Sequence, residues 1–532
     1  YMAFNMPGDR EDSRAIAVHD FTTGDTTRLT GDKYLSYDPA FSHDGHWLYF
    51  LSERNFQPSP SAPWGDRNMG TQFDKRVELY GLALSADAVF PFAKPDELTP
   101  EPESEDAEAD AAETTTDTET APAIDWQAAR QRLFKVPVDA GNYRALQVAA
   151  DRLFVLDREE SGTVLKSVPI THDDPKFAPF TTNVADYQLA NSGEQLFFRN
   201  TGSSPNLAIV PVGEKAPDDL SDYRVRTQGW RLAIEPANEW QQLFLDAWRM
   251  HRDFAYDSSL RGVDWVSVRD RLLPLAARIG HRSDLNDLLG QMSSEIGILH
   301  SQIRAGDQPT DEETASVASL GARYAPRAEG LEIIEIYEGE SELHDTLDPL
   351  SQPDDDIAVG DIITAVNNRP IASRADLSRA LLNRVGEQTL LTTRRGDRTL
   401  QNVVTPISTG AETMLRYRDW TGANASLVSN VSGGQIGYLH LRAMGGGDVA
   451  SFARDFFPQT HLDALIVDVR DNSGGNIDSW IIQQFLREAW AFWQAEPGGP
   501  TFTNMQHTFR GHLAVLINAG TYSDGESFAA GI

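Results

Sequence analysis

The chain has 532 residues, which is too long for one domain at about 100–200 residues per domain. Its hydrophobic share of 40%, with 11 Trp and 24 Phe, supplies several packed cores and excludes global disorder. The formal net charge of −33 argues against sequence-independent nucleic-acid binding, which needs basic patches. Cys is absent, which excludes disulfides, thiolate nucleophiles and Cys-bound zinc.

No run of residues reaches the roughly 18 apolar positions of a membrane span. Residues 1–4 have the composition of a strand interior and residues 528–532 that of a starting helix, so we expect a fragment at both ends. The compartment stays open. The lack of Cys and an acidic Thr/Ala-rich insert slightly favour a bacterial periplasm over the cytoplasm.

Residues 1–229 contain short strands separated by turns. In 40–52 an Asp-Gly turn leads into an alternating strand, and 189–200 repeats this pattern more weakly. Residues 77–82 and 132–138 share a second strand pattern, and such recurrence predicts the blades of a partial β-propeller. His43 and His46 have no evident third ligand, so we interpret them as turn residues rather than a metal site.

Residues 97–123 interrupt the strand pattern. Positions 101–120 hold nine acidic residues and no basic ones, which predicts a disordered insert in a surface loop. From 230 to 310 the apolar period becomes helical, as in 239–249 and 283–296, so a helical domain is expected there.

Residues 318–410 form a β-rich module in which 330–337 and 359–371 are predicted strands and Ser373 caps a helix. The string from Gly360 to Ile371 resembles a PDZ domain. PDZ domains capture extended peptide ends by adding a strand to a sheet edge. The alternative is a domain that only packs against and spaces its neighbours.

Residues 411–532 alternate strands and helices. The predicted strands are 436–441, 464–470 and 513–518, and the predicted helices are 448–457 and 477–490. This alternation predicts an α/β domain with a mainly parallel sheet, whose ligands sit beyond the carboxyl ends of the strands. The predicted fold class is therefore multidomain, with a propeller, a helical domain, a PDZ-like module and an α/β catalytic domain.

Two loops at that edge could carry chemistry. The glycines of 472–475 let backbone N–H groups approach a ligand, which fits a phosphate loop, an oxyanion hole or a plain tight turn. Ser523 lies in a sharp strand-to-helix turn, where it is either a nucleophile or a helix N-cap. A nucleophilic Ser needs a base, and His300 stands at the end of the helical domain.

The whole chain resembles the tricorn-type peptidases, the propeller-bearing branch of the C-terminal-processing serine peptidases of family S41. The matching strings, in chain order, lie at 240–257, 262–265, 436–440, 468–475 and 517–526. The resemblance implies that Ser523 is the acylating nucleophile, that His300 is its general base, and that Gly475 and Asp524 give backbone N–H groups to the oxyanion hole.

The resemblance also implies a Glu that orients the His through a bridging Ser. That Glu lies beyond residue 532 in the family, so we expect residues 1–532 alone to be inactive. In the archaeal pattern the bridging Ser precedes the His, but Leu299 occupies this place here, and Ser301 is the candidate substitute.

The expected function is therefore a serine peptidase that hydrolyses unfolded proteins or oligopeptides without metal or organic cofactor. A homo-oligomer is suggested by the archaeal relatives. One alternative, motivated by Leu299, is a catalytically inactive propeller–PDZ scaffold that binds peptides. Another is an esterase or amidase using the same Ser, which a PDZ domain disfavours because small acyl substrates have no chain end to capture.

Overall fold

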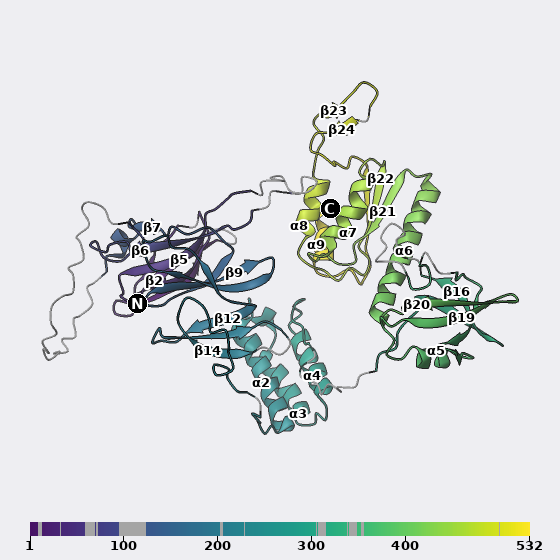
Figure 1. Ribbon diagram of the computed structural model, residues 1–532, viewed down its shortest axis with the longest axis horizontal. Coiled ribbons are helices and arrows are strands. Elements are labelled where there is room, and N and C mark those ends of the chain that lie inside the picture. Colours follow the sequence, from purple (N-terminus) through teal and green to yellow (C-terminus); the bar gives the residue numbers. More distant parts are fainter. Residues whose placement is uncertain are drawn as a thin grey trace. The chain divides into compact units, whose positions relative to one another are not determined.

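The computed structural model describes residues 1–8, 13–31, 33–58, 70, 73–94, 124–202, 206–227, 229–304, 306, 315–337, 339, 348–352, 356–499 and 501–532. The acidic segment predicted at 97–123 lies outside these residues. The chain divides into two compact units, Tyr1–Arg231 and Leu232–Ile532, each of which is described by itself (Figure 1).

The described part of the first unit consists of antiparallel sheets that follow one another along the chain. Their orders are β1-β2-β3, β4-β5-β6-β7, β11-β10-β9-β8 and β12-β13-β14. A short helix, α1 (Trp126–Ala129), precedes β7. The strands are β1 (Met2–Pro7), β2 (Arg14–His19), β3 (Thr26–Arg28), β4 (Ser36–Phe41), β5 (Trp47–Glu53), β6 (Val77–Ala83), β7 (Leu133–Lys135), β8 (Tyr143–Val148), β9 (Arg152–Glu159), β10 (Gly162–Pro169), β11 (Ala178–Thr182), β12 (Val184–Leu189), β13 (Gln195–Asn200) and β14 (Leu207–Pro211).

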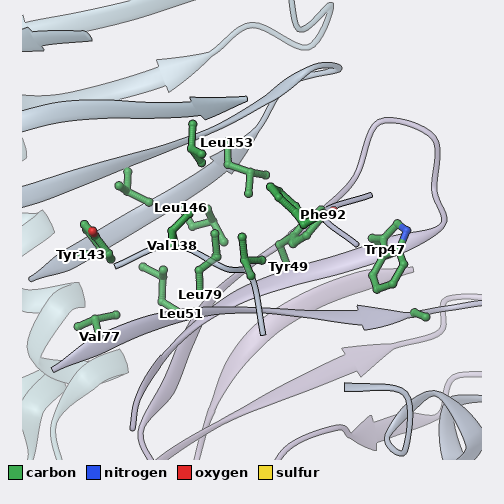
Figure 2. Close-up of a cluster of buried hydrophobic side chains, with 14 residues drawn as sticks. Trp47, Tyr49, Leu51, Val77, Leu79, Phe92, Val138, Tyr143, Leu146 and Leu153 are labelled. Atoms are coloured by element: carbon green, nitrogen blue, oxygen red, sulfur yellow. The ribbon is translucent and has the colours of Figure 1, made fainter. Parts of the chain in front are cut away.

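Strand β5 shows how consecutive sheets pack. Successive side chains of a strand point to opposite faces, so Leu48 and Phe50 join a core shared with β2, while Tyr49 and Leu51 join a core shared with β8 and β9. Figure 2 shows the second cluster, with Tyr49, Leu51 and Leu79 facing Leu146 and Leu153. The sheet that contains β5 therefore buries both faces against neighbouring sheets, as propeller blades do.

The two similar segments used to predict recurrent blades do not belong to different blades. The similar segments 77–82 and 132–138 lie in one sheet, because β6 pairs directly with β7. The blade repeat is instead carried by the meander itself, in which a hairpin turn such as that between β4 and β5 joins successive strands. His43 and His46 lie in this turn.

The second unit begins with helices α2 (Pro236–Phe254), α3 (Trp265–Ala276) and α4 (Arg282–Ser294), with a 3-10 turn, η2 (Leu260–Gly262), between the first two. Two buried tryptophans join α2 to α3 by exchanging hydrogen bonds. The indole N–H of Trp248 donates to the carbonyl of Trp265 at 2.7 Å, and that of Trp265 donates to the carbonyl of Trp248 at 2.9 Å. The tryptophans are thus core residues with satisfied polar ends.

The next part is a β-rich module with strand order β15-β16-β17-β19-β20, to which β18 adds by pairing with β17. Ser373 caps α5 by accepting the N–H of Asp376, as predicted. Buried Asp361 is held by Arg395, whose Nε donates to its carboxylate at 2.7 Å. The elements are β15 (Ala322–Arg327), β16 (Gly330–Ile336), β17 (Ile362–Val366), β18 (Arg369–Pro370), α5 (Arg374–Ala380), β19 (Thr389–Arg395) and β20 (Arg398–Val404).

The last part is an α/β module whose sheet, β21-β22-β25, is parallel at both pairings. A long helix, α6, leads from the β-rich module to this sheet and contacts β21 (Figure 1). Helices α8 and α9 pack against each other. The elements are α6 (Thr409–Ser432), β21 (Ile436–His440), α7 (Asp448–Phe456), η4 (Phe457–Gln459), β22 (Ala464–Asp468), α8 (Asp478–Phe485), β23 (Phe492–Gln494), β24 (Thr501–Thr503), β25 (His512–Leu516) and α9 (Asp524–Gly531).

The fold class predicted from the sequence is confirmed, with β-rich, helical and α/β parts in the expected order. One helix is shorter than predicted, because the helix expected at 477–490 ends at Phe485. The chain then forms a hairpin, β23 paired with β24, that the sequence analysis missed. Its aromatic side chains, including Trp493 and Phe502, are exposed. The hairpin therefore lacks the alternation of buried apolar and exposed polar residues by which a strand is predicted.

Candidate active site

Two loops meet at the carboxyl ends of the neighbouring parallel strands β22 and β25. Val469 just beyond β22 donates its N–H to Leu516 at the end of β25, so the loops leave the sheet side by side. The hydroxyl of Thr521 then donates to the carbonyl of Val469 at 2.8 Å, and the N–H of Tyr522 donates to the carbonyl of Asn472 at 2.9 Å. These bonds fix the second loop against the first.

Side-chain hydrogen bonds also connect and shape these two loops. Asn518 Nδ2 donates to Asp471 at 3.0 Å, and its Oδ1 accepts the N–H of Asp471 at 2.9 Å. Asn472 is fully buried and shapes its own loop by donating to the carbonyl of Leu441 and accepting the N–H of Gly474 at 2.8 Å. The loop 472–475 is therefore held both by the Asn472 side chain and by backbone bonds to the segment after β21.

The sheet end below these loops is anchored by a buried carboxylate. Asp468, at the end of β22, is fully buried, receives the guanidinium of Arg470 and accepts the hydroxyl of Tyr438 at 2.8 Å. Burial opposes ionisation of this carboxyl, but the bonds from Arg470 and Tyr438 hold its pKa below the ordinary 3.8. The loop after β22 thus starts from an ionised, fully bonded residue.

Ser523 occupies the sharp turn between β25 and α9. Its backbone has φ 53° and ψ −117°, a conformation that side-chain-bearing residues rarely adopt. The carboxylate of Glu526, one turn into α9, accepts the Ser523 N–H at 3.0 Å. Ser523 therefore stands at the N-cap position of α9 in a strained turn, with its hydroxyl directed to another partner.

That partner is His300. Its Nε2 lies 2.9 Å from the Ser523 hydroxyl oxygen, although the two residues are 223 positions apart in the chain. His300 follows α4 in an irregular segment, and its side chain is exposed. The structure thus brings together the two residues that the sequence analysis singled out as nucleophile and base.

The residues considered for orienting His300 are arranged differently from the expectation. The Ser301 hydroxyl lies 2.7 Å from Nε2 of His251, a residue of α2, instead of contacting His300. Leu299 carries an exposed side chain. Within the residues that the structure describes, Nδ1 of His300 has no hydrogen-bond partner. The orientation of the ring therefore depends on the backbone that carries it.

Gly475 and Asp524, the expected oxyanion-hole residues, follow Gly474 and Ser523 respectively. Gly474 contacts the turn directly, because a Cβ built on it would lie 2.6 Å from Cβ of Ser523. In the described part of the chain, the N–H groups of Gly475 and Asp524 donate to no acceptor. The role of these N–H groups as an oxyanion hole is therefore part of the proposed function.

The Asp524 side chain has a role that the sequence analysis missed. The carboxylate is buried and accepts the N–H groups of Ile477 at 2.8 Å and Asp478 at 3.0 Å, at the start of α8. Burial raises the pKa of Asp524 above 3.8. Its position after Ser523 gave no signal of this, because the partner N–H groups lie 46 and 47 residues away.

Two kinds of feature are absent from the described ranges. There, His, Asp and Glu side chains nowhere gather in a group of three or more that could hold a metal ion. Within the same ranges, no helix combines the length and apolarity needed to cross a bilayer.

Replacing Gly474 with Ala tests the packing of the two loops. The new methyl group would press against Ser523, and the φ of +83° at Gly474 disfavours any side chain. We expect the free energy of local opening of the 469–477 segment to fall by about 1–3 kcal/mol. Amide hydrogen exchange measures this free energy. Gly422→Ala is the matched control, because that position in α6 has nothing within 4 Å of the added atom. Equal exchange in both variants would contradict the close approach.

The raised pKa of Asp524 predicts a pH-dependent stability. Because the folded chain binds a proton here more readily than the unfolded chain, this contribution to stability is present below pH 3.8 and is lost as pH rises through the folded pKa. We expect the thermal midpoint of Asp524→Asn, relative to wild type, to rise as pH increases from 3.8 through the folded-state pKa of Asp524. Above that pKa the difference should stay constant.

The control for Asp524→Asn has the opposite sign. Hydrogen bonds from Gln242 and Arg249 lower the pKa of exposed Asp246, so Asp246→Asn should lose relative stability as pH rises. A midpoint difference for Asp524→Asn that does not change between pH 3.5 and 7 would show that burial does not favour the protonated acid.

Comparison with known proteins identifies three segments of the chain. The Tricorn protease C1 domain matches residues 236–294, the Tricorn protease PDZ domain matches 318–409, and Peptidase family S41 matches 435–532. The S41 segment contains both loops of the site, and His300 lies just after the C1 segment.

Curated relatives match along nearly the whole chain. Tricorn protease homolog 1 of Streptomyces coelicolor is 28% identical, over 100% of this chain and 50% of its own length. The Putative Tricorn-like protease C-terminal subunit of Sulfurisphaera tokodaii is 27% identical, over 99% and 59%, and the Tricorn protease of Thermoplasma acidophilum is 23% identical, over 97% and 46%. The chain thus spans about half the length of the curated relatives it matches.

A solved structure supports the fold. The crystal structure of the tricorn protease superimposes with a TM-score of 0.80 at 20% identity, covering 99% of this chain and 50% of the solved one. The resemblance drawn from the sequence motifs is confirmed: the chain carries, in order, the C1, PDZ and S41 peptidase domains of the tricorn-type peptidases.

Proposed function

We propose that the protein is a serine peptidase in which Ser523 is the nucleophile and His300 the general base. The observation that carries the proposal is the 2.9 Å separation between His300 Nε2 and the Ser523 hydroxyl, in a turn with a strained nucleophile backbone. A Ser hydroxyl is a weak nucleophile at neutral pH until a neighbouring base accepts its proton. The match of residues 435–532 to Peptidase family S41 supports the same reaction.

The proposed reaction has two stages. The Ser523 oxygen attacks the carbonyl carbon of the scissile peptide bond while His300 Nε2 takes the hydroxyl proton. His300 then gives this proton to the amine nitrogen as the C–N bond breaks, which leaves an ester on Ser523. Water, deprotonated by the same imidazole, hydrolyses the ester and restores the hydroxyl.

The backbone N–H groups of Gly475 and Asp524 are proposed to bind the oxygen that becomes negative in this reaction. They are the residues next to Gly474 and Ser523, and no acceptor in the described residues uses them. Each such donor typically contributes a few kcal/mol of transition-state stabilisation. Asp524 would then serve twice, with its N–H toward the substrate and its carboxylate toward α8.

The substrates are proposed to be unfolded proteins or oligopeptides. Each proposed role belongs to one of the domains expected at 1–229, 230–310, 318–410 and 411–532. The propeller is proposed to admit substrate chains, and the PDZ module to hold their ends. Strand β15 supports the second role, because it is the edge strand of its sheet, where a peptide can add as a further strand. The proposed reaction uses no cofactor. We also propose that the protein forms a homo-oligomer.

A peptide-binding scaffold without catalysis is the second candidate. Leu299 favours it, because a leucine cannot bridge the His300 ring to an orienting carboxylate. The lack of a partner for His300 Nδ1 within the described residues favours it as well. The two candidates differ in whether bound peptides are cut.

Replacing Ser523 with Ala in the full-length gene product separates these candidates. We expect wild type to generate new termini in a mixture of denatured peptides, detected by mass spectrometry, and Ser523→Ala to generate none. Ser527→Ala is the matched control, because this serine is exposed in the same helix and should leave cleavage unchanged. Peptides that bind to wild type but stay intact would favour the scaffold instead.

Residues 1–532 expressed alone are expected to bind peptides without hydrolysing them. The proposal rests on the lack of a partner for His300 Nδ1 among the described residues, and on the orienting Glu that the family resemblance implies outside residues 1–532. The test measures cleavage of the same peptide mixture by this chain and by its Ser523→Ala variant. Hydrolysis that the substitution abolishes would show that His300 needs no further orienting group.

A further inference from the structure

The side chain of Tyr522 spans from the turn that carries Ser523 to the segment that carries His300. Its hydroxyl donates to the carbonyl oxygen of Leu299 at 3.1 Å and accepts the side-chain N–H of Gln302 at 2.5 Å. The hydroxyl is thus bonded on both sides of His300 in sequence. The Tyr522 ring also meets the imidazole edge-on, with centroids 6.0 Å apart and an interplanar angle of 71°.

The backbone of Tyr522 is fixed at the other end of the side chain. Its N–H donates to the carbonyl of Asn472, in the loop after β22, and its carbonyl accepts the N–H of Gly525, in the first turn of α9. A tyrosine has only two principal side-chain torsions, so a phenol bonded at both ends behaves as a nearly rigid strut. The strut has one end in each of the two segments that must meet for proton transfer.

This strut matters because the His300 side chain itself has few other contacts, although Ile298 and Ile303 on either side pack against the helical core. Its side chain is exposed, and its Nδ1 has no partner among the described residues. Leu299 offers no side-chain hydroxyl, and the Ser301 hydroxyl is engaged by His251. The position of the ring is therefore set by the backbone of 299–302, which Tyr522 bonds at Leu299 and, through the side chain, at Gln302.

We propose that Tyr522 is a positioning residue, whose hydroxyl holds the 299–302 segment so that His300 Nε2 stays within hydrogen-bond reach of Ser523. The inference rests on the proposed roles of His300 and Ser523. Tyr522 acts through His300 and takes no part in bond making. Because the Leu299 side chain carries no polar group, the contact to its main-chain oxygen supplies a constraint that the side chain cannot.

Replacing Tyr522 with Phe in the full-length gene product removes both hydrogen bonds and keeps the ring against His300. We expect kcat for peptide cleavage, and the rate of Ser523 labelling by a fluorophosphonate probe, to fall about 10- to 100-fold, with KM unchanged. The reason is that a displaced base slows chemistry without weakening substrate binding. Tyr256→Phe, at a tyrosine that is 80% exposed, is the matched control and should keep wild-type rates.

A double variant separates positioning from general damage. Gln302→Leu removes the donor from the same hydroxyl, so the effects of Gln302→Leu and Tyr522→Phe should be clearly less than additive. Additive effects, a change confined to KM, or Tyr522→Phe labelling at the wild-type rate while Ser523→Ala stays unlabelled would each overturn the proposal and leave the proposed function standing. An unlabelled wild type that also fails to cut peptides would overturn both.

Discussion

The parallel pairing of β22 with β25 is the constraint on which the site depends. Because Asp468 lies opposite Leu516, both strands end at the same level and their loops leave the sheet together. Thr521 and Tyr522 then bond to Val469 and to Asn472 across the gap. A slip of one residue in this register would reverse the faces of the strand and break all of these contacts.

The proposed base comes from a part of the chain that lies outside this sheet. His300 follows the three-helix module, whose core includes the reciprocal bonds between Trp248 and Trp265. The site thus combines one group held by a sheet edge with another held by a helical core. The 2.9 Å distance between His300 and Ser523 therefore depends on the few contacts that join the two modules at this point.

Much of the fold could be predicted from the sequence, because the signals were local. The short apolar runs at 47–51, 464–467 and 513–516 are local signals that favour strands. The strand-to-helix turn at Ser523 fits an N-cap as well as a nucleophile, so the choice of both Ser523 and His300 needed the family resemblance. The 2.9 Å contact between them is a tertiary fact that no spacing encodes.

Other features could not be read from the chain. Ser301 follows His300 in sequence, yet its hydroxyl points to His251, because adjacent residues in an irregular segment need not share a direction. The sequence analysis assigned no role to Tyr522, whose partners Leu299 and Gln302 lie more than two hundred residues earlier. The hairpin β23–β24 has exposed aromatic side chains and therefore lacks the buried face that makes strands recognisable.

The backbone of Ser523 has a further consequence for how this position can change over evolutionary time. A residue with a side chain at φ 53° and ψ −117° lies in a conformation that glycine adopts at lower cost. As far as folding alone is concerned, the turn would be at least as well served by glycine. A serine at this position lowers the stability of the fold by about 1–3 kcal/mol. In a lineage that needed no hydroxyl here, mutation would tend to replace it.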